Sequence, residues 1–574
     1  MVNLLRILRR FAPGVALALG IVALWLHPAD EYFFGDSIST LLTRSLSWRA
    51  AFIDFFRLGG THWYRPLTNG FTQGVLWPIF GMNFTAYHLL SMFLHWCVCL
   101  GLFYALRVFL KDGPEGRMGA FVGAAFYAFH PIQFYATYDV CFYQEPIGGG
   151  LILGAVAFFY WYAEHGGWRY LVAGAVFFLA AVSARETAVF TPGLLAILLF
   201  PPTHWRRAAT AVGISGVGGA AFAGVYLFVM HPLRYQPPSY SSDWSPGHLA
   251  ANLWTCMRWS FGIATGTQTD GWRSPAIVTA LLWIAAVAIV LVSAVLWRKE
   301  PAIWKGPAFF CAASIAALST HRLWPHHLYL PLMGTALWIG GVVAAWKRSQ
   351  VAPRTIVPTA ATLLACISIT SAIGARYDSI DSWVGRDSWV TRQPVLYSRA
   401  LFRDLPRWRG VWVVVKTGDP SFSWLYGGLF RLMAGDHELD LETRLMPVRP
   451  DAAPPGIHVF EYRDSMLWPL AIPESLEVTP TSVSVSVTPD RVHPGTSYTV
   501  TIPALAGRTI DLRYRYNDHL PEVAYEFTKL AADGTAKILT PPDTPWGDVE
   551  IIGVRPSGAG DWSPVRVKVE VLRD

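Results

Sequence analysis

Residues 275–297 read PAIVTALLWIAAVAIVLVSAVLW and contain no charged side chain. An α-helix needs about 20 mostly apolar residues to cross the hydrocarbon core of a bilayer, and this run provides them. Apolar runs of similar length recur along most of the first 375 residues, and 53% of the 574 residues are hydrophobic. Only 15% are charged, against about 25% in a typical soluble protein. The sequence therefore predicts a polytopic α-helical membrane protein.

We expect about eleven membrane spans. Their approximate bounds are 11–27, 86–110, 118–134, 147–163, 169–184, 187–201, 207–230, 275–297, 306–320, 328–346 and 355–375. Basic residues precede the first span and then gather in every second loop: Arg6, Arg9, Arg10, Lys111, Arg117, Arg169, Arg206, Arg207, Arg298, Lys299, Lys305, Lys347, Arg348 and Arg354. Because cytoplasmic loops carry an excess of Lys and Arg, this pattern predicts a cytoplasmic N-terminus and an external C-terminus. It also accounts for the net charge of +7, so we expect no nucleic-acid partner.

The chain divides by composition. Residues 1–375 form the expected transmembrane domain, with large outer loops at 28–85 and 231–274, the first of which is predicted to contain an amphipathic surface helix. Residues 376–470 combine a strong strand, 410–415, with a helical stretch near 423–434, which indicates a small α/β domain. Residues 471–574 alternate apolar and polar side chains between Pro, Gly and Asp turns, as in an Ig-like β-sandwich. Both domains are expected outside the cell membrane, as periplasmic or extracellular parts.

Three acids follow the first apolar stretch, at the boundary of the membrane: Asp30, Glu31 and Asp36. The stretch runs into these acids instead of a small-residue cleavage site, so we interpret it as a retained span and not as a signal peptide. Charge at this depth is costly unless it has a partner or a function. Asp36 is predicted to cap a helix that begins near residue 37. Asp30 and Glu31 either have a chemical role or simply end a helix at the water interface.

Six short motifs occur in a fixed order along the first two thirds of the chain. They are YRPL at 64–67, FGMN at 80–83, YHLL at 87–90, FHP at 129–131, ARET at 184–187 and LYLP at 328–331. In this order they resemble the membrane half of the GT-C superfamily of glycosyltransferases, and above all the bacterial and TMTC-type O-mannosyltransferase group. The resemblance covers about residues 15–345 and leaves out the C-terminal domains.

The resemblance implies a transferase that uses a polyprenyl-phosphate sugar on the outer face of the membrane. It places the acidic pair of the family at Asp30 and Glu31, just past the first span. The further acid of the second outer loop matches Glu145 best, with Asp139 nearby. The dipeptide Arg185–Glu186 fits the Lys-Glu of the family's SKET motif.

One motif departs from the family. Where the family has RYLYLP, this chain has His326 and His327 before LYLP, and Arg322 lies four residues upstream of the first histidine. A titratable pair thus replaces a fixed positive charge. We expect Arg322 to contact the donor phosphate with the help of one histidine; the alternative is that these residues anchor the chain in the headgroup zone.

Glycosyl transfer from a lipid phosphate needs a base for the acceptor hydroxyl and a cation for the leaving phosphate. Carboxylates serve the first need and arginines the second. We therefore expect an inverting single displacement with Asp30 as base and Glu31 as its alternative. The phosphate-binding set is Arg322, His326, His327, Arg185 and Arg65, and the supporting acids are Asp139, Glu145 and Glu186. The alternatives are that Arg65 orders the first outer loop and that Asp139 and Glu145 belong to a solvated loop. Carboxylates near phosphate can hold Mg²⁺, but the resemblance favours no metal and no cofactor.

Several alternatives stay open. Arg185 and Glu186 interrupt an apolar run, so they form either a structural ion pair or a boundary between two short spans. The histidines at 88, 95 and 130 are expected to be hydrogen-bonded packing residues. The acceptor is a glycan, a protein or a lipid. The competing functions are a transporter or flippase for a lipid-linked sugar, for which inverted repeats are expected, and a non-catalytic scaffold that displays the C-terminal sandwich.

Overall fold

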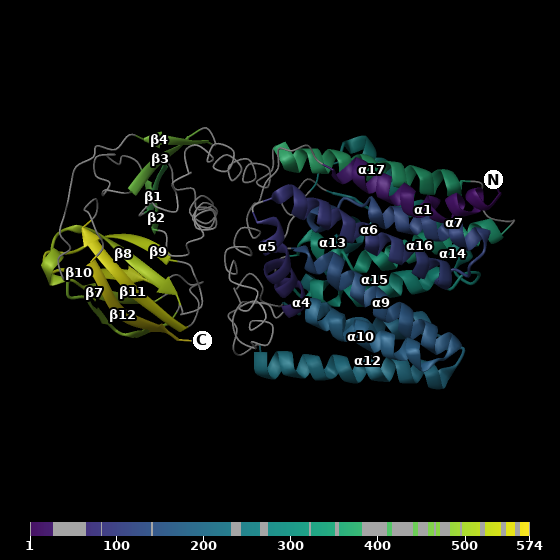
Figure 1. Ribbon diagram of the computed structural model, residues 1–574, viewed down its shortest axis with the longest axis horizontal. Coiled ribbons are helices and arrows are strands. Elements are labelled where there is room, and N and C mark those ends of the chain that lie inside the picture. Colours follow the sequence, from purple (N-terminus) through teal and green to yellow (C-terminus); the bar gives the residue numbers. More distant parts are fainter. Residues whose placement is uncertain are drawn as a thin grey trace.

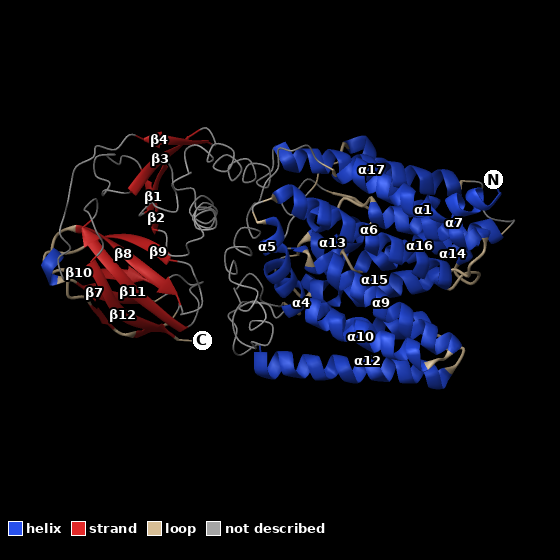
Figure 2. Ribbon diagram, in the orientation of Figure 1, coloured by secondary structure: helices blue, strands red, loops and turns tan. Residues whose placement is uncertain are grey.

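In the computed structural model of the protein, the helices gather in one part of the molecule and the strands in another (Figure 1, Figure 2). The structure describes residues 2–26, 65–81, 83–138, 142–230, 243–264, 272, 274–320, 323–349, 355–380, 410–415, 440–445, 457–463, 466–470, 483–493, 496–516, 523–540, 547–556 and 563–572. The predicted amphipathic helix of the first outer loop lies outside these residues.

Every predicted span coincides with a helix. These helices are α1 (Val2–Trp25), α6 (Phe84–Phe109), α7 (Pro114–Ala128), α9 (Gln144–His165), α10 (Trp168–Ala184), α11 (Thr191–Leu199), α12 (Trp205–Val225), α14 (Ala276–Leu296), α15 (Ala302–Leu318), α16 (Pro331–Arg348) and α17 (Ile356–Ile380). Among the described residues, five helices are long and apolar enough to cross a membrane alone, namely α6, α9, α12 with its extension, α14 and α17. A multi-pass helical membrane domain is therefore confirmed, and the number of spans stays a prediction.

Short helical segments join the long ones. They are α4 (Pro66–Gly70), η1 (Phe71–Leu76), α5 (Trp77–Phe80), α8 (Gln133–Tyr138), η3 (Glu186–Phe190), η4 (Tyr226–Met230), α13 (Pro246–Trp259) and η7 (Pro325–Leu328). In Figure 1, α4 and α5 lie at the left-hand end of the helical part. Contacts of α4 with α10 and of α8 with η7 link several of these segments to one another and to the ends of the long helices.

Small residues let α16 pack closely against two neighbours. A Cβ atom on Gly119 of α7 would lie 2.3 Å from the carbonyl oxygen of Gly340, and one on Gly306 of α15 would lie 2.7 Å from that of Gly334. Small residues at such crossings are typical of helices packed within membranes, where close backbone contact replaces the hydrophobic driving force. Helix α16 is consequently buried along most of its length.

The basic loops meet at one end of the bundle. Arg348, at the end of α16, forms an ion pair with Glu300 and donates a hydrogen bond to the carbonyl of Leu110 after α6. Lys305, at the start of α15, donates to the carbonyl of Leu198 at 2.5 Å. These contacts show that several of the basic loops, which alternate along the sequence, lie at the same end of the helical bundle. Which side of the membrane this end faces stays a prediction.

The strands between 410 and 470 form one sheet, in the order β2-β1-β3-β4. Strand β1 (Gly410–Val415) pairs in parallel with β2 (Asp440–Leu445) and β3 (Ile457–Arg463), and β4 (Met466–Leu470) is antiparallel to β3. Parallel neighbours need crossover connections, as in α/β folds. The predicted strand at 410–415 is confirmed, and the predicted helix at 423–434 lies outside the described residues.

The last part of the chain forms two sheets over one apolar core. One sheet has the order β10-β7-β5 and the other β6-β12-β11-β8-β9. Their strands are β5 (Ser486–Thr488), β6 (Arg491–Val492), β7 (Ser497–Thr501), β8 (Thr509–Tyr516), β9 (Val523–Lys529), β10 (Thr535–Leu539), β11 (Gly547–Pro556) and β12 (Ser563–Val571). Val500 and Ile538 of the first sheet share a core with Leu512, Ile551 and Val569 of the second. The Ig-like type and the domain boundaries stay predictions.

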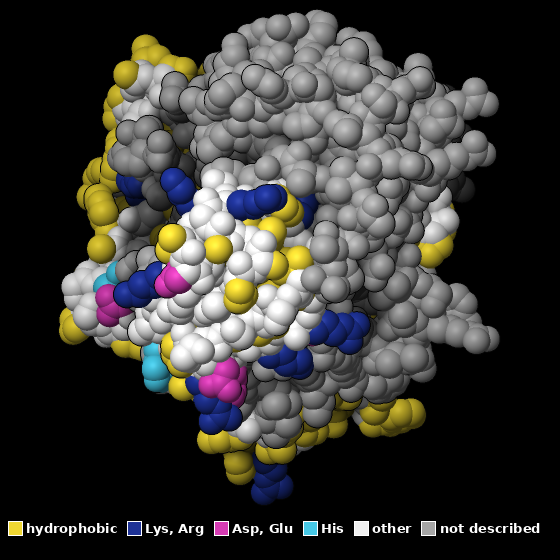
Figure 3. All heavy atoms as spheres, turned by 90° about the vertical axis from the view of Figure 1, so that its left-hand side faces the viewer, with side chains coloured by type: hydrophobic (Ala, Val, Ile, Leu, Met, Phe, Trp, Pro, Cys, Tyr) yellow, Lys and Arg dark blue, Asp and Glu magenta, His cyan; other side chains and the backbone are white. Residues whose placement is uncertain are grey.

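Figure 3 shows the strand-rich end of the molecule face-on. In the described part of this face, Lys and Arg side chains are scattered among uncharged ones and do not gather in a single patch (Figure 3).

Candidate functional site

The helical bundle is broken at Arg185. Its backbone is extended, with φ −157° and ψ 130°, so that α10 ends at Ala184 and the short helix η3 begins at Glu186. The charged dipeptide therefore marks a boundary between two helices, which was one of the two predicted explanations. Consecutive side chains on extended backbone point in opposite directions. Arg185 and Glu186 accordingly have different partners.

Arg185 forms an ion pair with Glu145, and the two side chains are only 6% and 2% exposed. Glu145 lies in the first turn of α9, where the helix dipole favours a negative charge. Gly148, one turn further on, makes room for the arginine. A Cβ atom there would lie 2.8 Å from the Cβ of Arg185.

Glu186 pairs instead with Arg65, the arginine of the YRPL motif. The Nε and Nη2 atoms of Arg65 donate to the two carboxylate oxygens at 2.9 and 2.6 Å. This is a bidentate pair, the arrangement in which arginine binds carboxylate most strongly. Thr68 adds a hydrogen bond at 3.3 Å to the carbonyl of Ala184. Together these bonds hold α4 against the junction of α10 and η3.

Two histidines lie beside these pairs, in the η7 turn that precedes α16 and is outside the spanning segments. The ring of His326 lies 4.3 Å from that of Phe142 and 4.5 Å from that of His327, between centroids. Burial and the positive charges of Arg185 and Arg65 lower the pKa of His327 to about 3. Burial, His327 and the same arginines also lower the pKa of His326. Both rings are therefore neutral near pH 7.

A hydrogen-bonded layer lies beneath the charged residues. The hydroxyl of the buried Tyr329 lies 3.1 Å from Nδ1 of His95, and Nε2 of the same ring lies 3.2 Å from the carbonyl oxygen of Ala128. A Cβ atom on Gly149 would lie 2.9 Å from the Tyr329 ring. These contacts tie α6, α9 and the start of α16 together below the site.

His88 belongs to the same end of the bundle. Its Nδ1 and Nε2 atoms lie 2.8 Å from the carbonyl oxygens of Thr137 and Trp25. The prediction that His88 and His95 are hydrogen-bonded packing residues is thus confirmed. His88 also fixes the end of α1, directly before the segment that carries the acidic pair.

Four predicted site residues, Asp30, Glu31, Asp139 and Arg322, lie outside the described residues, and their roles stay predictions. The chain leaves the described part after Leu26 and returns at Arg65, and both positions belong to the end of the bundle that carries the two ion pairs. The structure brings Arg65, Glu145, Arg185 and Glu186 together with His326 and His327.

The sequence analysis did not predict the role of the glycines that allow α9 to pack closely against Arg185 and Tyr329. Gly148 and Gly149 follow Glu145 closely, in the run EPIGGG, and contact Arg185 and Tyr329 respectively. Three successive glycines in a helix are unfavourable for the helix itself. Their occurrence beside a buried acid was the available signal for close packing at this point.

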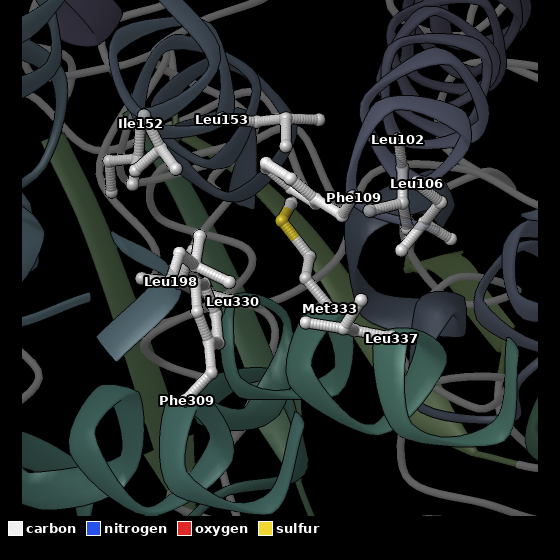
Figure 4. Close-up of a pocket in the computed structure, with 11 residues that line it drawn as sticks. Leu102, Leu106, Phe109, Ile152, Leu153, Leu198, Phe309, Leu330, Met333 and Leu337 are labelled. Carbon is white, nitrogen blue, oxygen red and sulfur yellow. The ribbon is translucent and has the colours of Figure 1, made fainter. Parts of the chain in front are cut away.

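A cavity of about 20 Å³ lies deeper in the bundle, among α6, α9, α11, α15 and α16. Figure 4 shows apolar side chains pointing into it, among them Leu106, Ile152, Phe309 and Met333. A space of this size holds about one water molecule, and its lining has no charged or hydrogen-bonding side chain. It is a packing defect of the core and not a substrate site.

Among the described residues, no group of three or more His, Cys, Asp or Glu side chains could hold a metal ion. The acids that do lie at the site, Glu145 and Glu186, are each paired with an arginine. The expectation that no metal takes part stays a prediction.

Solved structures of two other proteins are similar to this chain. The chain is similar to ArnT from Cupriavidus metallidurans bound to undecaprenyl phosphate, with a TM-score of 0.44 and 12% identity over 76% of this chain and 90% of that one. It is also similar to the Archaeoglobus fulgidus oligosaccharyltransferase in complex with Zn and sulfate, with a TM-score of 0.42 and 10% identity over 98% of each chain. The same oligosaccharyltransferase tethered to an acceptor peptide gives a TM-score of 0.40 and 10% identity, over 99% of this chain and 98% of that one.

Both proteins are GT-C glycosyltransferases. At 10–12% identity and TM-scores below 0.5, this likeness concerns the arrangement of the chain alone. No protein-family model matches the sequence, and no functionally curated protein matches it. The function proposed below therefore rests on the residues of the chain itself.

Proposed function

We propose that the protein is a membrane glycosyltransferase that moves a sugar from a polyprenyl-phosphate donor to a hydroxyl of an acceptor, on the outer face of the cell membrane. The observation that carries this proposal is the buried pair of Arg185 and Glu145 beside the bidentate pair of Arg65 and Glu186. Charged residues at a break between apolar helices are costly and mark substrate sites.

Arg185 is the residue best placed to bind the donor phosphate. Its side chain is 6% exposed, and one of its terminal nitrogens faces Glu145. Its Nε atom is buried and has no hydrogen-bond partner among the described residues. A buried donor without a partner calls for an explanation, and a phosphate oxygen satisfies this one. Arginine is suited to the task because it binds phosphate through several parallel hydrogen bonds.

The neighbouring histidines act as neutral donors in this proposal. Since the pKa values of His326 and His327 are lowered, each ring carries one N–H group near pH 7 and no charge. Hydrogen bonds from such groups stabilise charge that develops on the leaving phosphate. The arginine of the family motif would thus be replaced in function by Arg185 and two neutral donors.

The chemical step is a single displacement. The acceptor hydroxyl gives its proton to the carboxylate of Asp30, or of Glu31, and its oxygen attacks the anomeric carbon of the sugar. The bond between that carbon and the phosphate oxygen breaks as the new bond forms. The polyprenyl phosphate leaves with both electrons of the broken bond, and Arg185 stabilises its added charge. The configuration at the anomeric carbon is inverted.

Lipid analysis of the purified full chain tests the donor class. We expect polyprenyl phosphate, or its sugar ester, to co-purify with the wild-type protein and to fall at least tenfold in the Arg185→Met variant. Glu300→Gln is the matched control, because it breaks an ion pair at the opposite end of the bundle. Equal lipid content in Arg185→Met and wild type, both folded, would contradict the proposal.

Transfer assays on the same samples separate an enzyme from a transporter of lipid-linked sugar. An Asp30→Asn variant is expected to bind the donor and to lose transfer, because the base is missing. A transporter or a scaffold needs no base at this position. Full transfer activity in a normally folded Asp30→Asn protein would remove the assignment of the base.

A further inference from the structure

At the end of the bundle where the basic loops meet, three exposed arginines each lie beside an aromatic ring. The guanidinium carbon of Arg206 is 5.7 Å from the centroid of the Trp205 ring, and that of Arg298 is 5.1 Å from the centroid of Trp297. Arg169 lies in the same way over the tyrosine that follows it, at 5.0 Å. Such a contact holds a guanidinium over the ring face, and its N–H groups can still donate to another partner.

The loops that carry these arginines are joined by contacts. A Cβ atom on Gly166 would lie 3.2 Å from the guanidinium carbon of Arg207, so the start of α12 lies against the turn between α9 and α10. The rings of Phe200 and Trp304 are 6.2 Å apart between centroids, so the end of α11 contacts the start of α15, directly after the α14–α15 loop. The arginines of these loops together form what we call the arginine surface: Arg169, Arg206, Arg207 and Arg298.

The protein does not compensate the charge of the arginine surface. Asp112 and Glu300 lie at the same end of the bundle and pair with other arginines. Among the described residues, Glu115 and Glu164 are the remaining acids of this end, and neither forms an ion pair with the arginine surface. A group of like charges without counter-charges attracts an anionic partner.

Exposed tryptophans place the arginine surface at the edge of the membrane. Trp168, Val172 and Val176 are all exposed and follow one another at a spacing of four residues, along one face of α10. Trp205, at the start of α12, and Trp297, after the end of α14, are exposed as well. Tryptophan is enriched at the depth of the lipid headgroups, above the apolar surface of a spanning helix. The arginines beside these rings therefore lie at headgroup depth.

We propose that the arginine surface binds the headgroups of anionic phospholipids and thereby anchors the α9–α10 turn, the start of α12 and the α14–α15 loop at the membrane. Arginine binds phosphate through parallel hydrogen bonds, and basic groups next to spanning helices are attracted to anionic lipids. An acidic protein is the competing occupant. It would match the charge but not the apolar face below Trp168. This inference does not depend on the proposed function.

Native mass spectrometry of the full chain tests the proposal. The protein is purified in detergent and titrated with phosphatidylglycerol or with phosphatidylcholine of the same acyl chains. We expect phosphatidylglycerol to bind about tenfold more tightly, because each arginine adds attraction to an anionic headgroup. Phosphatidylglycerol should also raise the melting temperature more than phosphatidylcholine does, since a ligand of the folded state stabilises it.

Three variants assign the preference to the arginine surface. The neutral variant should lose most of the preference for phosphatidylglycerol; it combines Arg169→Gln, Arg206→Gln and Arg298→Gln. Replacement of the same three arginines by lysine keeps the charge and should keep the preference. The matched control removes three exposed positive charges from the strand-rich part and should bind like wild type; it combines Arg508→Gln, Lys537→Gln and Arg566→Gln. If the neutral variant does not fold, the pair Arg169→Gln and Arg298→Gln takes its place.

Each of the other outcomes would overturn the proposal. Equal binding of the two lipids by the wild type would show that the headgroup charge is not recognised. An equal loss in the neutral variant and in the control would assign the preference to the net charge of the chain. A further probe is polyglutamate, added to the protein in phosphatidylcholine nanodiscs. If it binds the wild type and not the neutral variant, while phosphatidylglycerol shows no preference, the surface belongs to an acidic protein partner instead.

Discussion

Arg185 and Glu145 form an ion pair whose side chains are almost completely removed from solvent. Forty residues separate the two in sequence, and each lies at the end of a helix that packs against the other along its length. A buried pair of this kind is costly to desolvate and contributes little net stability by itself. Its presence at the boundary of a membrane domain is therefore better explained by binding than by folding.

Breaking this pair separates stability from activity. Glu145→Gln leaves the buried charge of Arg185 without its partner, which is expected to cost about 3–5 kcal/mol. Glu300→Gln breaks the pair with Arg348 at the other end, where the arginine is 32% exposed and water takes over part of its solvation. We expect both variants to melt at a lower temperature in detergent, Glu145→Gln more so. Only Glu145→Gln should lose transfer activity per folded molecule; a similar loss in both would refute a special role for Arg185.

The bidentate contact of Arg65 is testable by a change that keeps its charge. Arg65→Lys retains one hydrogen bond to Glu186 at best, since lysine lacks the planar fork of arginine. We expect a cost of about 1 kcal/mol and a tenfold slower transfer, because α4 is no longer fixed against η3. The control is Arg107→Lys, which changes the bidentate pair with Asp112 at the other end. That pair is exposed, so its loss should change neither stability nor rate measurably; equal rates for both variants would contradict the role of Arg65.

Gly148 is expected to tolerate no side chain. The added methyl of Gly148→Ala would lie 2.8 Å from the Cβ of Arg185 and push it away from α9. Overpacking of this kind costs about 1–3 kcal/mol, and the displaced arginine should lower transfer at least tenfold. Gly213→Ala is the matched control, since it meets nothing within 4 Å and replaces a helix glycine by a better helix former. Wild-type transfer by Gly148→Ala would show that the position of Arg185 does not matter.

The histidines predict a dependence of stability on pH. The folded pKa of His327 is about 3 and that of His326 is also lowered, whereas unfolded histidine titrates near 6.5. Below about pH 6.5 the unfolded chain therefore binds more protons than the folded one. The free energy of unfolding consequently decreases as the pH is lowered from about 6.5. His327→Gln should melt with a smaller difference between pH 7.5 and pH 5.5 than wild type. Identical pH dependence of the two proteins would contradict the neutral state of His327.

The helices of this protein could be predicted from sequence because each apolar run carries its own signal. Residues 275–297 need no partner to be recognised as membrane-spanning. The partners of Arg185 and Glu186 carried no such signal. The two residues are adjacent, and the sequence left open whether they form an ion pair or separate two short spans. The extended backbone at Arg185 directs the side chains apart, to α9 and α4, and this backbone is set by tertiary packing.

The pairing of the other site residues also depends on tertiary packing and leaves no local signal in the sequence. The motif order predicted that Arg65, Glu145, Arg185 and Glu186 belong to one site, and the structure places them together. It did not predict which acid joins which arginine, because the contacts cross 40 and 121 positions of chain. The role of Gly148 was also hidden, since the space that a glycine leaves is visible only against its neighbour.

The adjacency of Arg185 and Glu186 has a consequence for assembly. Two successive residues hold different segments: Arg185 pairs with Glu145 of α9, and Glu186 pairs with Arg65 directly before α4. A shift of this backbone by one residue would break both ion pairs together. Arg65 is also where the chain returns from the segment that carries Asp30. Under the proposed function, this junction links the segment of chain that carries Asp30 to Arg185, so that loss of either ion pair would disturb the binding of acceptor and phosphate together.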